Sequence, residues 1–316
     1  MRTIRIGSRA SRLALVQAEL IIDGLREKFP QYQYEIIKII TKGDKILDKT
    51  LDKIGGKGLF VREIQKALID KEIDLAVHSM KDMPADSPEG LMLGAITKRE
   101  DPRDVLVTKN HIPWSQLPTD ARIGSSSLRR QAQLLNLNGC LKIEPIRGNV
   151  ETRISKIETQ TLDGVILAAA GLNRLGLTEE IAHYFNTEEF VPAVGQGALG
   201  CEIRKDDEEL YNILQELNHK ETYNTVMAER SFLKVMEGGC HVPIGAYGKK
   251  VGEELQLTGM VGAPNGKEII KETEIGGFDD FVEIGRRLAE KMQSKGAKEL
   301  LEEVANKDPK DRLIKE

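Results

Sequence analysis

The sequence has few aromatic residues, no excess of positive charge and no long apolar run. Aromatic side chains make up 4% of the 316 residues, which is too few for a surface on which nucleic acid bases stack. Lysine and arginine number 46 against 50 aspartates and glutamates, so the net charge of −4 argues against binding nucleic acid through bulk positive charge. No apolar run approaches the ~18 residues of a membrane helix, and residues 1–7 lack the long apolar region of a secretory signal. We therefore expect a cytoplasmic enzyme or binding protein with no nucleic acid or membrane partner.

Cysteine and histidine are also sparse. The chain has three cysteines, and no two of them are close in sequence, so we expect reduced thiols rather than a disulfide framework. The five histidines show no zinc-ligand spacing, and we predict no metal site. Cys140 and Cys201 are interpreted as buried packing residues. Cys240, which follows two glycines and precedes His241, is the candidate for a reactive or modified thiol.

The first part of the chain alternates between strand and helix patterns. Apolar residues recur at helical spacing over Leu13–Phe29, and a second helix is predicted over Phe60–Ile69. Strands are predicted over Thr3–Ile6, Tyr34–Ile40 and Asp74–Val77. Strands separated by helices predict a mainly parallel sheet with both faces covered.

This pattern recurs further along the chain. Arg5–Ser8 reads Arg-Ile-Gly-Ser, and Arg122–Ser125 repeats it 117 residues later. Two weaker pairs follow in the same order, Glu35–Ile40 with Ile143–Ile146 and Asp74–Val77 with Asp163–Ile166. Three pairs in one order indicate two α/β domains of similar plan, although short strand–glycine–helix segments can also look alike by chance. Gly90–Arg103 and Val191–Gly200 are the predicted crossovers between them.

From about residue 220 the pattern changes to a third, smaller α+β unit. Strands are predicted over Val242–Tyr247, Leu255–Val261 and Glu268–Ile275, and an amphipathic helix over Phe278–Gln293. The turn signal Pro264–Gly266 lies between the second and third of these strands, which indicates an antiparallel sheet.

Two glycine-rich segments suggest phosphate or nucleotide sites at first sight. Gly195–Gly200 matches G-x-G-x-x-G, but residues 201–204 after it read as a strand and not as the helix that a dinucleotide site needs. We interpret it as a hinge and reject a nicotinamide site. The lysine- and glycine-rich residues 45–59 form either a plain surface loop or a lid that places Lys53 and Lys57 over an anionic ligand. Composition does not decide between these two interpretations.

Arginines gather where ligand sites of α/β domains are usually found. Arg9 and Arg12 lie at the start of the first predicted helix, and Arg129 and Arg130 begin the helix after Ser125–Ser127. Cations are mildly unfavourable at a helix N-terminus unless an anion is bound there by the side chains and the backbone N–H groups. Predicted strand ends carry three more, at Arg147, Arg153 and Arg174. Any single one reads as a solvated charge, but the set predicts a cationic cleft for a polycarboxylate or polyphosphate.

One acidic residue falls inside this predicted cleft. Asp82 follows a buried strand and precedes Pro84, which places it at the ligand edge of the sheet, with Lys81 beside it. An Asp–Lys pair in a turn is usually just solvated. A carboxylate within a cationic cleft is instead suited to stabilising a developing positive charge.

Six segments, taken together and in order, resemble the hydroxymethylbilane synthase (porphobilinogen deaminase) family of tetrapyrrole and heme biosynthesis. They are Gly7–Ala14, His78–Pro84, Gly124–Arg130, Arg147–Arg153, Gly195–Leu199 and Glu237–Cys240. The resemblance implies an α/β fold of two domains like the halves of a type II periplasmic binding protein, plus a smaller α+β C-terminal domain. The implied limits are residues 1–97, completed by about 195–217, for domain 1, residues 98–194 for domain 2, and residues 218–316 for domain 3 with the cysteine loop.

The resemblance also implies the activity. Such an enzyme is a transferase that joins four porphobilinogen molecules head to tail with loss of ammonia, which gives hydroxymethylbilane (preuroporphyrinogen). The chain grows on a dipyrromethane cofactor, and the resemblance attaches this primer to Cys240 by a thioether. Porphobilinogen is then the partner, and a monomer is expected.

Particular residues match the family's functional positions. Asp82 matches the catalytic aspartate, which faces the cation left when ammonia departs. The implied cofactor-binding residues are Cys240, Lys81, Asp82, Ser127, Arg129, Arg130 and Gly148. The implied substrate-binding residues are Arg9, Ser11, Arg147, Arg153, Arg174, Lys53 and Lys57. His241 departs from the glutamine that we associate with other members.

Two alternative functions are weighed against this one. A non-catalytic two-lobed binding protein for an organic polyanion explains the arginines but neither Asp82 nor the Gly-Gly-Cys segment. A cysteine-dependent acyl transferase or hydrolase using Cys240 and His241 predicts a free thiol, whereas the deaminase interpretation predicts a capped one.

Overall fold

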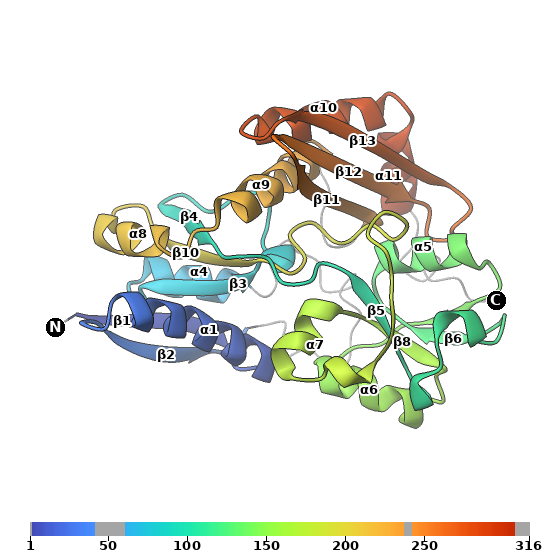
Figure 1. The fold of residues 1–316 in the computed structure, drawn as a ribbon, viewed down its shortest axis with the longest axis horizontal. Helices are drawn as coiled ribbons and strands as arrows, with labels where there is room; N and C mark the ends of the chain where they lie inside the picture. Colours follow the sequence, from blue (N-terminus) through green and yellow to red (C-terminus); the bar gives the residue numbers. More distant parts are fainter. Residues whose placement is uncertain (1, 42–60, 237–241, 307–316) are drawn as a thin grey trace.

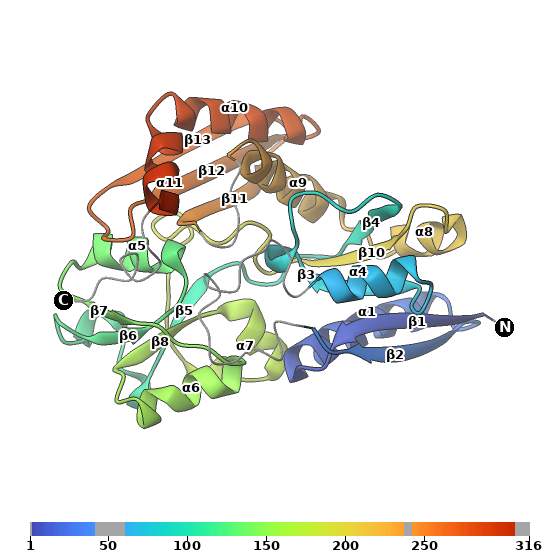
Figure 2. The same ribbon diagram turned by 180° about the vertical axis from the view of Figure 1, so that it is seen from behind.

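The structure is a computed structural model that describes residues 2–41, 61–236 and 242–306. Lys53, Lys57, Cys240 and His241 lie outside the described residues. Figures 1 and 2 show two α/β lobes side by side, with a third unit lying over both. Among the described helices, none is long and apolar enough to cross a membrane.

The first lobe is built on a five-stranded sheet with the order β2-β1-β3-β10-β4. Its strands are β1 (Thr3–Arg9), β2 (Gln33–Ile39), β3 (Leu75–Ser79), β4 (Leu91–Ile96) and β10 (Leu199–Arg204). Its helices are α1 (Arg12–Lys28), α4 (Arg62–Ile69) and α8 (Glu208–Gln215). β1 pairs in parallel with β2 and β3, whereas β10 runs antiparallel to β3 and β4. The sheet is therefore mainly parallel, as predicted, with one reversed strand.

The second lobe repeats this plan in the order β7-β6-β8-β5-β9. Its strands are β5 (Asp104–Thr108), β6 (Arg122–Gly124), β7 (Lys142–Glu144), β8 (Gly164–Ala168) and β9 (Ile181–Tyr184). Its helices are α5 (Leu128–Leu137), α6 (Val150–Thr159) and α7 (Ala169–Leu175). β5 is the reversed strand, antiparallel to β8 and β9. The three sequence pairs occupy equivalent places in the two sheets, which confirms the prediction of two α/β units of similar plan.

The same hydrogen bond occurs in both lobes and explains part of the sequence repeat. Asp74 precedes β3, and its carboxylate accepts the backbone N–H of Arg5 at 3.0 Å. In the second lobe, Asp163 precedes β8, and its carboxylate accepts the backbone N–H of Arg122 at 2.7 Å. Each aspartate thus ties the start of one strand to the neighbouring strand of its sheet, β1 in the first lobe and β6 in the second, where a backbone donor would otherwise lack a partner.

The reversed strands join the two lobes. After β4 the chain crosses to form β5 in the second lobe, and after β9 it returns to form β10 in the first. The two crossovers hydrogen-bond to each other, since Thr97 N–H donates to Leu199 O at 3.1 Å and Glu100 N–H donates to Gly197 O at 3.2 Å. Gly197 has φ +91°, and an added Cβ would lie 2.4 Å from the Glu100 carbonyl oxygen, so this close approach requires glycine.

The third unit is an antiparallel sheet covered by helices. It comprises β11 (Ile244–Val251), β12 (Glu254–Gly262) and β13 (Ile269–Gly277), with α9 (Lys220–Val235), α10 (Phe281–Gln293) and α11 (Ala297–Asn306). A buried apolar cluster that includes Phe232, Leu257 and Leu288 joins α9 and α10 to the sheet. The predicted antiparallel α+β unit is confirmed, and with the two lobes it completes the predicted fold class. The residue limits of the three domains stay a prediction.

The two cysteines within the described residues differ from each other. Cys201 in β10 is fully buried, and burial raises its pKa to about 12, as expected of a packing residue. Cys140 is exposed in the turn between α5 and β7, so its prediction as a buried residue is wrong. The side chain is exposed because this turn lies on the surface.

Candidate active site

The turn that carries Lys81 and Asp82 is anchored on both sides. β3 ends at Ser79, and a 3₁₀ turn, η1 (Met80–Asp82), follows it. Met80 N–H donates to Ala198 O at 3.0 Å, and Met83 N–H donates to Met80 O at 3.2 Å. Met80 and Met83 are buried, whereas Asp82 is exposed. The apolar residues therefore fix the backbone and leave the carboxylate accessible at the edge of the sheet.

Charges from both lobes act on one another at this edge. Burial is the main cause that lowers the pKa of Lys81 to about 8; Arg130 and Arg153 of the second lobe lower it further, while Asp82 opposes them. Burial likewise lowers the pKa of Arg153 to about 10, with contributions from Arg130 and Arg147 and with Asp82 opposing. The structure thus brings together five of the predicted site residues in a partly desolvated, cationic region between the lobes.

Arg129 and Arg130 have a carboxylate partner that the sequence analysis missed. Asp104, the first residue of β5, is fully buried and accepts from Arg129 Nη1 at 2.7 Å and from Arg130 Nε at 2.9 Å. Burial alone would raise the pKa of Asp104, but the two guanidinium groups hold it well below its usual range. Two cations against one anion leave a net charge of +1 in this buried group.

Three helices begin with side-chain caps; two of the caps, Ser11 and Ser127, are predicted site residues, and the third, Asn149, follows the predicted Gly148. Ser11 caps α1, accepting from Ala14 N–H at 3.3 Å, and Ser127 caps α5, accepting from Arg130 N–H at 3.4 Å. Asn149 caps α6, accepting from Thr152 N–H at 2.8 Å. The first turns of α1, α5 and α6 supply partial positive charge and N–H groups of the kind that bind carboxylates.

Gly148 has a backbone conformation that requires glycine. Its φ is +117°, and an added Cβ would lie 2.6 Å from Thr152 Cγ2. Its carbonyl accepts from Arg153 Nε at 2.9 Å. Gly148 therefore helps to orient one of the predicted substrate-binding arginines.

The other predicted arginines lie around this region at different depths. Arg9 ends β1, and Arg147 lies between β7 and α6; both are half-buried. Arg174 lies on α7, where its Nη2 donates to Gly197 O of the second crossover at 2.7 Å. Burial lowers the pKa of Arg174, and Glu100 opposes that shift. Arg174 thus contacts the crossover directly.

One ion pair joins the two lobes beside the capped helices. Arg12 Nη1 at the start of α1 lies 3.1 Å from Glu151 Oε1 in the first turn of α6. This exposed pair shows that the segment of Arg9 and Ser11 lies close to the segment of Gly148.

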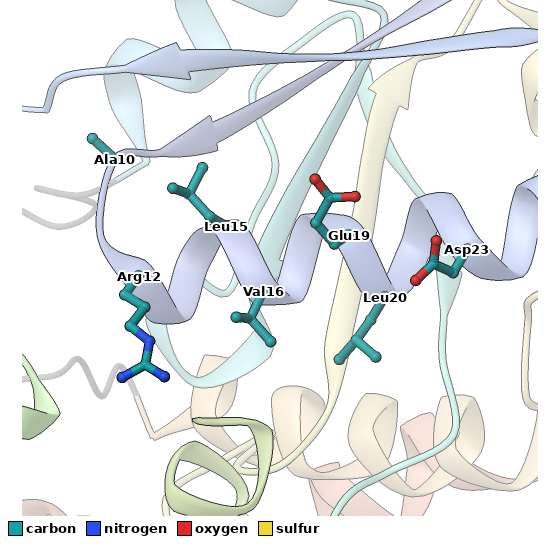
Figure 3. A pocket seen from close by; sticks show the side chains of 7 residues that line it. All are labelled: Ala10, Arg12, Leu15, Val16, Glu19, Leu20 and Asp23. Carbon is teal, nitrogen blue, oxygen red and sulfur yellow. The ribbon is translucent and has the colours of Figure 1, made fainter. Parts of the chain in front are cut away.

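A hollow lies along α1, beginning at Arg12. It has a volume of about 490 Å³ and is lined by Ala10 and six residues of α1, as Figure 3 shows. Its lining combines apolar side chains such as Val16 and Leu20 with one guanidinium, that of Arg12, and the carboxylates of Glu19 and Asp23. With two anions against one cation it does not suit a polyanion. Within the described part of the chain, no group of three or more His, Cys, Asp and Glu could hold a metal ion.

Comparison with known proteins gives a full-length match. Residues 4–212 match the model of the family described as porphobilinogen deaminase, dipyromethane cofactor binding domain, and residues 223–294 match porphobilinogen deaminase, C-terminal domain. The porphobilinogen deaminase of Alkaliphilus metalliredigens is 66% identical over 304 residues, covering 96% of each chain. That of Bacillus subtilis is 51% identical over 306 residues, covering 96% of this chain and 97% of the other.

Proposed function

The chain belongs to the porphobilinogen deaminase family, and on that premise we propose which of its residues carry the reaction. It is a transferase of tetrapyrrole biosynthesis that polymerises four porphobilinogen molecules head to tail with release of ammonia, giving hydroxymethylbilane on a dipyrromethane cofactor. Porphobilinogen is its substrate. The family match does not favour a non-catalytic binding protein or a cysteine-dependent acyl transferase.

The described residues suit the cofactor, because each of its two pyrrole rings carries two carboxylates and the region between the lobes is cationic. We propose that Cys240 holds the cofactor through a thioether. The residues proposed to bind the rest of it are Lys81, Asp82, Ser127, Arg129, Arg130 and Gly148. When bound, the cofactor supplies the pyrrole carbon to which the first substrate is joined.

We propose that Arg9, Ser11, Arg147, Arg153, Arg174, Lys53 and Lys57 bind the carboxylates of the substrate and of the growing chain. The lowered pKa of Arg153 supports this role, as the lowered pKa of Lys81 supports its proposed role toward the cofactor. A cation that is desolvated among other cations gains more from a bound carboxylate than a solvated one does. The net charge of +1 on the Asp104–Arg129–Arg130 group adds to the same attraction.

Asp82 is the proposed catalytic residue. Loss of ammonia leaves positive charge on the pyrrole ring of the substrate, and a fixed carboxylate beside that ring stabilises the charge as it develops. Asp82 is exposed at the sheet edge on an anchored turn, and it interacts with Lys81 and Arg153. The observation that carries the proposal is this exposed carboxylate beside desolvated cations, since the other carboxylate of the region, Asp104, is buried and paired with Arg129 and Arg130.

We also propose that the protein acts as a monomer in the cytoplasm. The two cysteines within the described residues, Cys140 and Cys201, are both free thiols. Free thiols fit a reducing compartment.

The test compares two aspartates of one loop. Asp82→Asn should lower kcat at least about 100-fold, with KM for porphobilinogen changed little, because a fixed charge that acts on the transition state is lost. Asp86→Asn is the matched control, because Asp86 is exposed and pairs with the exposed Lys234 at 2.6 Å. Steady-state rates of ammonia release measure both. Equal rates in the two variants would refute the role of Asp82.

A further inference from the structure

A buried arginine of α9 holds the loop that follows Asp82. Arg230 Nη2 donates to Pro84 O at 2.7 Å and to Ala85 O at 2.8 Å. The residue is 6% exposed, so these charge-assisted hydrogen bonds form away from bulk water. One guanidinium group from the third unit thus fixes two successive peptide groups that begin two residues after Asp82.

Arg230 is a buried charge with polar neighbours, which a residue that only filled space would not need. Burial lowers the pKa of Arg230, and the nearby Glu202 opposes that shift. Glu202 is itself fully buried and accepts from Gln65 Nε2 at 2.9 Å, with His78 Nε2 3.0 Å away. Arg230 Nη1 has no hydrogen-bond partner among the described residues. Burying a charge with one donor unused costs free energy, and an apolar side chain of similar length would fill the space without that cost.

Apolar contacts place α9 against the same turn. Val226 of α9 packs in a buried cluster with Met80 and Met83, the two residues that anchor the turn of Asp82. Arg230 lies one helical turn after Val226, so it adds polar contacts where the apolar contacts end. Together they fasten the chain on both sides of Asp82 to a single helix.

We propose that Arg230 is a positioning residue for the reaction, which holds the carboxylate of Asp82 in place through the carbonyls of Pro84 and Ala85. It touches neither the substrate nor the cofactor. The proposal rests on the catalytic role proposed above for Asp82.

The first part of the test uses Arg230→Lys and Arg230→Met. Lysine keeps the charge but cannot present the planar fork of donors, and methionine keeps only the apolar volume. We expect kcat to fall about tenfold for lysine and further for methionine, because misplacing a reacting group by a fraction of an ångström lowers the rate. KM for porphobilinogen and the mass of the bound cofactor should stay unchanged. Lys234→Ala is the matched control and should keep the full kcat, because its ion pair with Asp86 is exposed.

The second part separates positioning from a merely structural role. Single-turnover rates are compared for Arg230→Lys, Asp82→Asn and the double variant. If Arg230 acts through the Asp82 carboxylate, Arg230→Lys should lower the single-turnover rate when Asp82 is present. The double variant should then be no slower than Asp82→Asn alone.

Three other outcomes would contradict the proposal, and each has a different meaning. An equal fold-loss from Arg230→Lys in both backgrounds would overturn the role of Arg230 and leave that of Asp82 intact. An undiminished rate for Asp82→Asn alone would overturn the proposed function and this inference with it. Failure of both Arg230 variants to fold, measured by thermal unfolding, would show that Arg230 holds the fold rather than the loop.

Discussion

Arg99 and Glu229 form a buried ion pair, with 2.6 Å between Nη1 and Oε1, that joins the first crossover to α9. The same carboxylate accepts from Gly195 N–H of the second crossover at 2.6 Å and from Gly248 N–H of β11 at 2.8 Å. Glu229 is fully buried. One side chain therefore ties both crossovers and the third sheet together, at the place where the two lobes must be held relative to each other.

Glu229→Gln should lower the free energy of unfolding by about 3–5 kcal/mol, because it leaves a buried guanidinium without its counter-charge. Urea titration followed by circular dichroism measures the change. Asp120→Asn provides the comparison, since Asp120 pairs with Lys142 at 3.1 Å in an exposed position. It should change the same quantity by less than about 1 kcal/mol. Similar values for the two variants would mean that the buried pair contributes nothing beyond a surface pair.

Lys81 should give the assembly of the cofactor an alkaline limb. With its pKa lowered to about 8 by burial, Lys81 is protonated below that pH and loses its charge above it. The uncharged form binds carboxylates less well, so the rate at which the cofactor-free protein assembles its cofactor from porphobilinogen should fall as the pH rises through about 8. Lys81→Arg should remove the fall, because a guanidinium stays protonated throughout this range. Lys142→Arg, at an exposed position, should keep the original profile. Profiles of the same shape for Lys81→Arg and the unmodified protein would assign the limb to another group.

Gly148→Ala should impair substrate binding as well as stability. The new Cβ would meet Thr152 and displace the carbonyl that orients Arg153, so we expect a severalfold rise in KM for porphobilinogen. Gly176→Ala is the matched control, because Gly176 also has a positive φ, +70°, but open space around its Cβ position. Both changes should destabilise the fold by about 1–3 kcal/mol through backbone strain. A KM that rises equally in both variants would show that strain, and not the Arg153 contact, is responsible.

The fold could be predicted where the sequence repeats a local pattern. Arg-Ile-Gly-Ser recurs at Arg5 and Arg122 because the two copies lie in equivalent strands, β1 and β6, and each is tied to an aspartate, Asp74 or Asp163. The reversed strands β5 and β10 could not be found in this way. Each joins the sheet of one lobe directly after a crossover from the other lobe, and hydrophobic periodicity does not record the direction of a strand.

Site residues could be predicted where their type and position in the sequence indicated their chemistry. Residues whose role depends on a distant contact could not. Arginines at helix N-termini indicated an anion site, and Arg130 does lie close enough to lower the pKa of Arg153. Asp104 was missed because the residues before it read as a crossover. Its burial against Arg129 depends on the position of β5 in the folded sheet, which the sequence does not show. Arg230 lies within an ordinary helical pattern. No periodicity shows that its side chain reaches a loop more than a hundred residues away.

The most direct test of this account is the intact mass of the purified protein under denaturing conditions. The account predicts an excess equal to two linked porphobilinogen-derived pyrroles, which disappears in Cys240→Ser and persists in Cys140→Ser. A sample of unmodified mass should gain that excess after incubation with porphobilinogen. An unmodified mass that porphobilinogen does not change, or an excess that persists in Cys240→Ser, would contradict a covalent primer on Cys240.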